Sequence, residues 1–170
     1  MVLHAPSKKT QKHFAKLYDT ALRSLSHTSK HSCGASHHGQ LNFLSVNQPW
    51  RNCWYGKHIS CLHSEVATLR RLIRLQMRRG KGVSDFRRKM KKVTLYIARL
   101  NMDTQTRKVR VFSHSAPCQQ CLKFMKRCGI KKIVFSTNNA YNQVCSVKVS
   151  DFENAHVTWA NRLQGVSVKS

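Results

Sequence analysis

Residues 109–137 read VRVFSHSAPCQQCLKFMKRCGIKKIVFST and predict a strand, a helix and a second strand in succession. The flanking runs VRVF and KKIVFST are rich in the β-branched and aromatic residues that strands favour. Between them, CQQCLKFMKRC is typical of a helix, and Gly129 follows it where a left-handed C-cap is usually found. Two cysteines, Cys118 and Cys121, therefore stand at the start of a helix that comes after a strand.

Two further strands are predicted on either side of this unit. VTLYIARL, residues 93–100, is almost continuously apolar, which is typical of a central strand covered on both faces. QVCSVKV, residues 143–149, alternates and is separated from KKIVFST only by the short loop NNAYNQ. The two strands are therefore expected to form an antiparallel hairpin.

The first half of the chain predicts two helices around a strand pair. Apolar residues with helical spacing define a first helix over 14–25 and a second, basic helix from Leu62 to Met77. Between them LNFLSV, residues 41–46, alternates like a strand and is preceded by HTSKHSCGASHHGQ, residues 27–40, a small and polar stretch that we expect to be exposed.

Helices that alternate with strands in this order predict an α/β fold in which one sheet is flanked by helices. At 170 residues the chain fits one domain, residues 1–170, with residues 1–10 and 165–170 as loose tails. No apolar run approaches the roughly 18 residues that cross a bilayer. Because the start also lacks the pattern of a secretory signal, the sequence predicts an intracellular protein, cytoplasmic or nuclear, with no membrane partner.

Charge predicts a polyanionic partner. Thirty-one Lys and Arg face six Asp and Glu, a net charge of +25 that repels itself unless phosphate-bearing molecules or salt screen it. The charge is concentrated in the basic segment Arg70–Lys92, where Asp85 is the only acid. A solvated helix face kept soluble by its charge is the plain alternative for this segment.

Chemistry is expected where two short motifs open helices: HSE at His63–Glu65 and PCQQC at Pro117–Cys121. Cysteines three residues apart share a helix face, so their sulfurs can converge on one metal ion. Together with His63 they make a three-ligand zinc set that leaves a fourth position for water, which is the arrangement of a catalytic site. The seven cysteines, an odd number in a chain of this length, also fit reduced thiols and a metal better than a disulfide framework.

Zinc brings the pKa of its water close to neutrality and yields a hydroxide that can attack C4 of cytosine or C6 of adenine. Glu65, two residues beyond the histidine, can shuttle protons from the water to the ring and to the departing amine. The chain has only two glutamates, Glu65 and Glu153, which makes a chance match to this motif less plausible.

The motifs HSE and PCQQC, with the strand before the cysteines and GIKKIVFST after them, resemble the cytidine deaminase superfamily over residues 30–163. The resemblance implies a three-layer α/β/α sandwich with a mixed five-stranded sheet, one catalytic zinc on His63, Cys118 and Cys121, and Glu65 as proton shuttle. It also implies that Asn47 contacts a sugar, and that Ser64 replaces a common alanine. The residues that we expect to bind substrate are Asn47, Ser64, His114, Ser115, Ala116, Pro117 and Tyr141.

A second, structural zinc would have to use Cys53, His58 and Cys61 with Cys33, His37 and His38, and their spacing does not favour it. Cys128 and Cys145 are interpreted as core residues. Members of the superfamily often form dimers, tetramers or hexamers, so a homo-oligomer is an option, although the net charge opposes self-association at low salt.

Three functions remain open from the sequence. The first is deamination of a cytosine nucleoside or nucleotide, which the two motifs and the predicted hairpin favour. The second is deamination of single-stranded DNA or RNA, with the basic segment Arg70–Lys92 following the phosphates. The third is nucleic-acid binding without catalysis, with zinc kept for folding; Glu65 and the lack of a fourth ligand beside the motifs count against it.

Overall fold

The computed structural model describes residues 2–26, 29–49, 53–54, 57–58, 61–78, 83–102, 109–138, 144–154 and 156. Four helices and eleven strands lie within these ranges. The helices are α1 (Lys8–Leu22), α2 (Ser64–Arg78), α3 (Val83–Met90) and α4 (Gln119–Cys128). The strands are β1 (Val2–His4), β2 (Ser29–His37), β3 (Gln40–Val46), β4 (Gln48–Pro49), β5 (Cys53–Trp54), β6 (Lys57–His58), β7 (Cys61–Leu62), β8 (Thr94–Met102), β9 (Val109–Ser113), β10 (Lys132–Ser136) and β11 (Val144–Lys148).

The main sheet has the strand order β1-β11-β10-β8-β2-β3, and β9 also pairs with β8. β8 and β10 are parallel, and all other pairs in this sheet are antiparallel, so the predicted mixed sheet is confirmed. The described sheet has seven strands, whereas the resemblance implied five. The predicted hairpin is β10–β11, in which Phe135 faces Cys145. β2 and β3 are joined through His38 and Gly39, which both have positive φ (49° and 81°), as a two-residue hairpin turn of type I′ requires.

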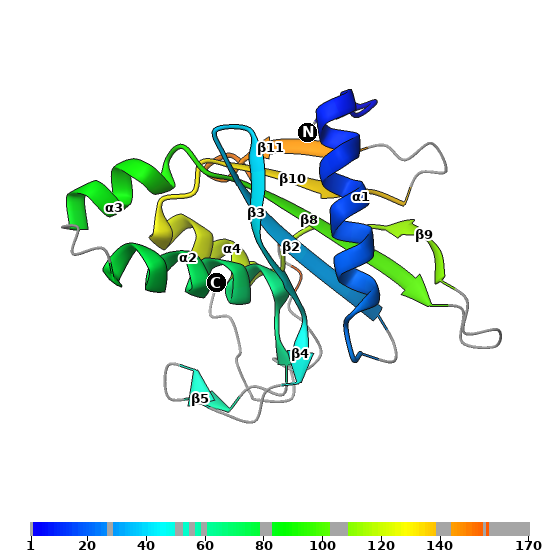
Figure 1. Ribbon diagram of the computed structural model, residues 1–170, viewed down its shortest axis with the longest axis horizontal. Coiled ribbons are helices and arrows are strands. Elements are labelled where there is room, and N and C mark those ends of the chain that lie inside the picture. Colours follow the sequence, from blue (N-terminus) through cyan, green and yellow to red (C-terminus); the bar gives the residue numbers. More distant parts are fainter. Residues whose placement is uncertain are drawn as a thin grey trace.

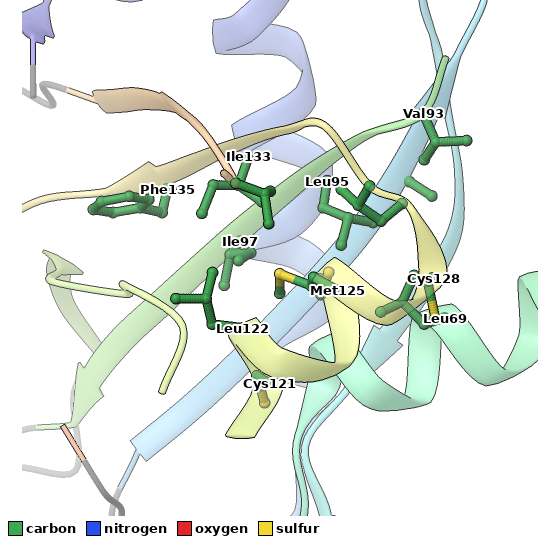
Figure 2. Close-up of a cluster of buried hydrophobic side chains, with 14 of the residues drawn as sticks. Leu69, Val93, Leu95, Ile97, Cys121, Leu122, Met125, Cys128, Ile133 and Phe135 are labelled. Atoms are coloured by element: carbon green, nitrogen blue, oxygen red, sulfur yellow. The ribbon is translucent and has the colours of Figure 1, made fainter. Parts of the chain in front are cut away.

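Helices cover both faces of this sheet, which confirms the predicted three-layer sandwich (Figure 1). On one face, α2 and α4 cover the larger core cluster, to which Leu69 and Met125 contribute from the helices and Leu95 and Ile97 from β8 (Figure 2). On the other face, Phe14 and Leu17 of α1 pack on a smaller cluster. Because successive residues of a strand point to opposite faces, β8 contributes to both clusters, as predicted for a central strand.

The small, polar stretch expected to be exposed is instead the buried strand β2, and this expectation was wrong. Residues 32–36 are all buried, and the Ser32 Oγ–H donates to the carbonyl of Leu17 at 2.7 Å. Small side chains allow close packing here: a Cβ on Gly34 would lie 2.9 Å from Leu41 Cδ1 and from Leu44 Cδ2. Composition therefore suggested an exposed loop. The side chains of β2 are small because little space is left between this strand and its neighbours.

The N-terminal residues also differ from expectation, since residues 1–10 are not simply a loose tail. Val2–His4 form β1 on the outer side of β11, and α1 begins at Lys8 with the Ser7 side chain accepting from its first turn. The first helix ends at Leu22, so Leu25, predicted on its buried face, is 77% exposed. Among the described helices, none combines the length and the apolar character that crossing a bilayer requires. The predicted tail at 165–170 lies outside the described residues.

Candidate metal centre

Three side chains from two helix starts converge at one point. His63 directly precedes α2, where its carbonyl accepts the first helical hydrogen bond from the Ala67 N–H at 3.0 Å. Its Nδ1 lies 3.2 Å from the Sγ of Cys121 and 3.5 Å from the Sγ of Cys118. All three donor atoms lie within 4.8 Å of one another, so the structure brings together the residues that the two motifs singled out.

The start of α4 explains how its two sulfurs meet. Pro117, predicted in the first helical turn, instead precedes the helix, and Cys118 is the N-cap with extended backbone (φ −67°, ψ 164°). An N-cap side chain lies over the third helical residue, which here is Cys121. Pro117 is fully buried and Ala116 is half-buried against the core. Because these two residues directly precede Cys118, their packing fixes the position of the N-cap.

The cluster has the spacing of a tetrahedral zinc site. With Zn–S near 2.3 Å and Zn–N near 2.05 Å, a tetrahedron places nitrogen and sulfur about 3.5 Å apart. The Nδ1–Sγ distance to Cys118, 3.5 Å, equals this value, and the distance to Cys121, 3.2 Å, is slightly shorter. Within the ranges that the structure describes, these three residues are the only group of His, Cys, Asp and Glu side chains placed to share a metal ion. Two sulfurs and one imidazole suit zinc, which is borderline soft.

The three donor groups shift one another's pKa values. A hydrogen bond from the Cys121 thiol lowers the pKa of Cys118 to about 4; burial opposes this shift and the His63 imidazole adds to it. Burial alone would lower the pKa of His63, but the hydrogen bond to Cys118 and the charge of Glu65 outweigh it and raise that pKa to about 9. The hydrogen bond that Cys121 donates, together with burial, raises its own pKa. A metal ion that binds here must therefore displace protons from His63 and Cys121.

Glu65 lies beside the cluster in the first turn of α2. Its side chain is only 5% exposed, and Oε2 accepts a hydrogen bond from the Ser64 hydroxyl at 3.2 Å. Burial raises the pKa of this carboxyl, the positive His63 opposes the shift, and the Cys118 thiolate adds to it. A carboxyl that protonates more readily than usual suits a group that accepts and returns protons.

Two of the predicted substrate-binding hydroxyls are engaged within the protein. Ser64 is fully buried, and its hydroxyl serves Glu65. The Ser115 Oγ–H donates to the carbonyl of Ile97 at 2.8 Å, and its Oγ accepts from the Ser136 N–H at 2.9 Å. These residues hold the site in shape, and a contact with substrate stays a prediction for both.

Asn47 is also held by internal bonds. Its Oδ1 accepts from the Ser24 hydroxyl at 2.6 Å and from the His31 N–H at 2.9 Å, while Nδ2 donates to the carbonyl of Ser29 at 3.2 Å. The amide therefore ties the start of β2 to the end of α1, and the sugar contact that the resemblance implies stays a prediction.

His114 is the most accessible of the predicted substrate contacts that the structure describes. It is exposed, its N–H bonds to the Oδ1 of Asn138, and its ring meets Phe135 edge to face with centroids 5.6 Å apart. Tyr141 lies outside the described residues, as do the side chains of Cys53, His58 and Cys61 that were weighed for a second zinc. Cys33, Cys128 and Cys145 are core residues, as interpreted for the last two.

Sequence reasoning missed a polar row beside the metal cluster, formed by His31, Arg99 and Ser113. They are direct cross-strand neighbours on β2, β8 and β9. Leu95, Ile97 and Arg99 occupy alternate positions along β8, so Arg99 lies on the face of the sheet that carries the larger core cluster. Within the described residues, the buried Arg99 Nε and Ser113 Oγ have no hydrogen-bond partner. A lone charge inside VTLYIARL was the available signal.

The lowered pKa of His31 makes the free energy of unfolding depend on pH. Burial, Arg99 and His63 lower it from 6.5 to about 3, so the folded protein keeps the imidazole neutral where the unfolded chain is protonated. Stability is therefore complete above pH 6.5 and falls as the pH drops toward 3. Between pH 7 and pH 5 the loss from this residue is about 2 kcal/mol. Urea unfolding measures the fall in the free energy of unfolding between pH 7 and pH 5. This fall should be larger for the parent than for His31→Gln by that amount, and equal falls would contradict the assignment.

The fold and the cluster together define a class: an α/β/α sandwich whose paired helix starts present one histidine and two cysteines to a common point. No protein-family model matches the sequence, and no curated protein matches it. Among solved structures, a crystal structure of cytidine deaminase from Burkholderia pseudomallei matches with a TM-score of 0.51 over 83% of this chain and 93% of that one. At 14% identity the similarity establishes the fold, which is that of a cytidine deaminase.

Proposed function

We propose that the protein is a zinc-dependent hydrolase that removes the amino group of a cytosine base. The observation that carries the proposal is the convergence of His63, Cys118 and Cys121 beside the buried carboxyl of Glu65. A fold shared with a solved cytidine deaminase supports the choice of cytosine over adenine. The substrate is a cytosine nucleoside or nucleotide, or a cytosine within a single strand.

His63, Cys118 and Cys121 would hold the zinc, which when bound supplies a water acidic enough to act as a nucleophile near neutral pH. Glu65 takes one proton from this water and delivers it to N3 of the ring. It then carries the second proton to the amino group at C4. A C4–O bond forms, the C4–N bond breaks, and cytosine plus water becomes uracil plus ammonia.

A purely structural metal is the competing function, and the donor set argues against it. Structural zinc is closed by four protein ligands. In the part of the chain that the structure describes, the cluster has three. Glu65, buried beside the cluster with its pKa raised by burial, has a place in a hydrolytic reaction and no comparable place in a structural site.

Ammonia release from a small substrate panel tests the proposal. Purified, zinc-loaded protein is incubated separately with cytidine, dCMP, a cytosine-containing oligonucleotide and dAMP. We expect ammonia and the matching uracil product from at least one of the first three, and none from dAMP. Ammonia release from dAMP alone would contradict cytosine as the substrate base while supporting hydrolytic deamination. Release from none of the four would contradict the proposal that the protein is a deaminase.

A further inference from the structure

A second feature lies at the outer edge of the sheet and is lined by residues other than the metal cluster. There β3 passes between α2 and the C-terminal end of α1 (Figure 1). These three elements and the end of β7 enclose a groove of about 360 Å³. Its apolar lining includes Leu44 and Leu62, and its rim carries four arginines, Arg23, Arg70, Arg71 and Arg74.

The arginines come from two elements but form one positive surface. Ala67, Arg70, Arg71 and Arg74 share one face of α2 at the spacing of three and four residues. Arg23 reaches the groove from the end of α1, so a residue far away in sequence completes the set. Arg23, Arg71 and Arg74 are exposed, and the described lining contains no Asp or Glu.

This arrangement carries a cost in the free protein. Like charges four residues apart on a helix destabilise it, and Arg70 and Arg74 have that spacing. The Nη1 of Arg71 donates to the carbonyl of Leu44 at 2.7 Å, which fixes this guanidinium against β3. An anion with several charges in a row would offset the repulsion, and guanidinium groups match phosphate oxygens in geometry.

The lining of the groove combines positive charge with apolar surface. Its arginines can contact phosphates, as the positively charged grooves that follow a single strand do, while Leu44 and Leu62 can contact sugars and bases. The bases of a single strand are open to such apolar contact, whereas those of a duplex are paired and stacked inside it. Leu62 at one end of the groove directly precedes His63, so the groove reaches the same end of α2 as the metal cluster.

We propose that this groove binds the phosphodiester backbone of single-stranded nucleic acid. The binding stands independently of catalysis; that the bound strand is also the substrate rests on the deaminase function proposed above. The proposal assigns only part of the basic segment Arg70–Lys92 to nucleic-acid binding. Arg70, Arg71 and Arg74 belong to the groove, whereas the cations of α3 lie outside its described lining and include Arg88, which pairs with Asp85 at 2.7 Å.

Fluorescence anisotropy with labelled oligothymidine tests the proposal, because this probe contains no cytosine. Arg23→Gln with Arg74→Gln removes two charges from the groove, and the control, Arg87→Gln with Lys91→Gln, removes two exposed charges in and directly after α3. We expect the groove variant to bind about tenfold more weakly at low salt, with a salt slope reduced by about 1.4. The control should bind like the parent.

Equal weakening of both double variants would show that binding follows net charge, and parental binding by the groove variant would show that the groove is not used. Either result overturns the proposal. Circular dichroism confirms folding, and Arg74→Gln alone serves as the probe if the double variant is unfolded. Oligothymidine binding without ammonia from any substrate would contradict the deaminase and leave the groove standing; turnover of dCMP without oligothymidine binding would do the reverse.

Discussion

Replacing Glu65 with glutamine is expected to lower the rate of deamination by roughly 10²- to 10⁴-fold, the contribution of a positioned proton-transfer group. Glutamine has the same shape as glutamate and can accept the Ser64 hydrogen bond that Oε2 accepts now. It cannot take a proton from water or return one to the ring. The variant should therefore keep one zinc per chain, measured by elemental analysis, while ammonia release from the active substrate is nearly abolished.

Glu153 provides the matched control, because it is the only other glutamate in the chain and is exposed. Glu153→Gln should retain parental turnover and parental zinc. If Glu65→Gln remained as active as the parent, the proton shuttle would be misassigned. If it lost both zinc and folding, its turnover would report on structure, so the zinc content and the unfolding midpoint are measured on the same sample.

Replacing Cys121 with serine should remove the metal and with it the stability that the metal confers. In the parent, zinc at a free concentration about 100 times its dissociation constant stabilises the folded state by about 2.7 kcal/mol. A serine hydroxyl cannot replace the thiolate that zinc prefers. Urea unfolding with and without a chelator should therefore show a large difference for the parent and almost none for Cys121→Ser.

Cys128→Ala is the control for the loss of a buried sulfur. Cys128 lies on the same helix and is 5% exposed, but it is separate from the metal cluster. This variant should lose some stability with and without chelator alike, and it should keep the difference between the two conditions. If the free energy of unfolding of the parent were the same with and without the chelator, the proposed metal at this site would be contradicted.

The residues that local spacing can identify were found from the sequence, and those that depend on strand pairing were not. Cys118 and Cys121 are three residues apart at a helix start, and His63 and Glu65 stand at another, so the two motifs were visible without a fold. His31 and Arg99 meet only because β2 and β8 pair in one particular register, which their own segments do not encode.

The fold shows the same division. Periodic segments such as VTLYIARL and CQQCLKFMKRC were correctly predicted as β8 and α4. A strand pair was predicted between the first two helices, but the burial of β2 was not, because burial of Ser32 and Gly34 reflects the close approach of α1 and β3, a tertiary effect that overrides composition. The groove follows this rule as well, since its α2 arginines were visible as a basic run, whereas Arg23 joins them only after folding.

The distance between the ligands along the chain has a consequence for how the protein is made. His63 precedes Cys118 by 55 residues, so a ribosome working at 5–20 residues per second exposes the imidazole about 3 to 11 seconds before the first sulfur. During that interval the nascent polypeptide holds a single donor of the set, and β8 and β9 are still being synthesised. Capture of the metal is therefore a late event in biosynthesis: it follows the synthesis of β8 and β9, whereas β10, the parallel neighbour of β8, is synthesised only after Cys121.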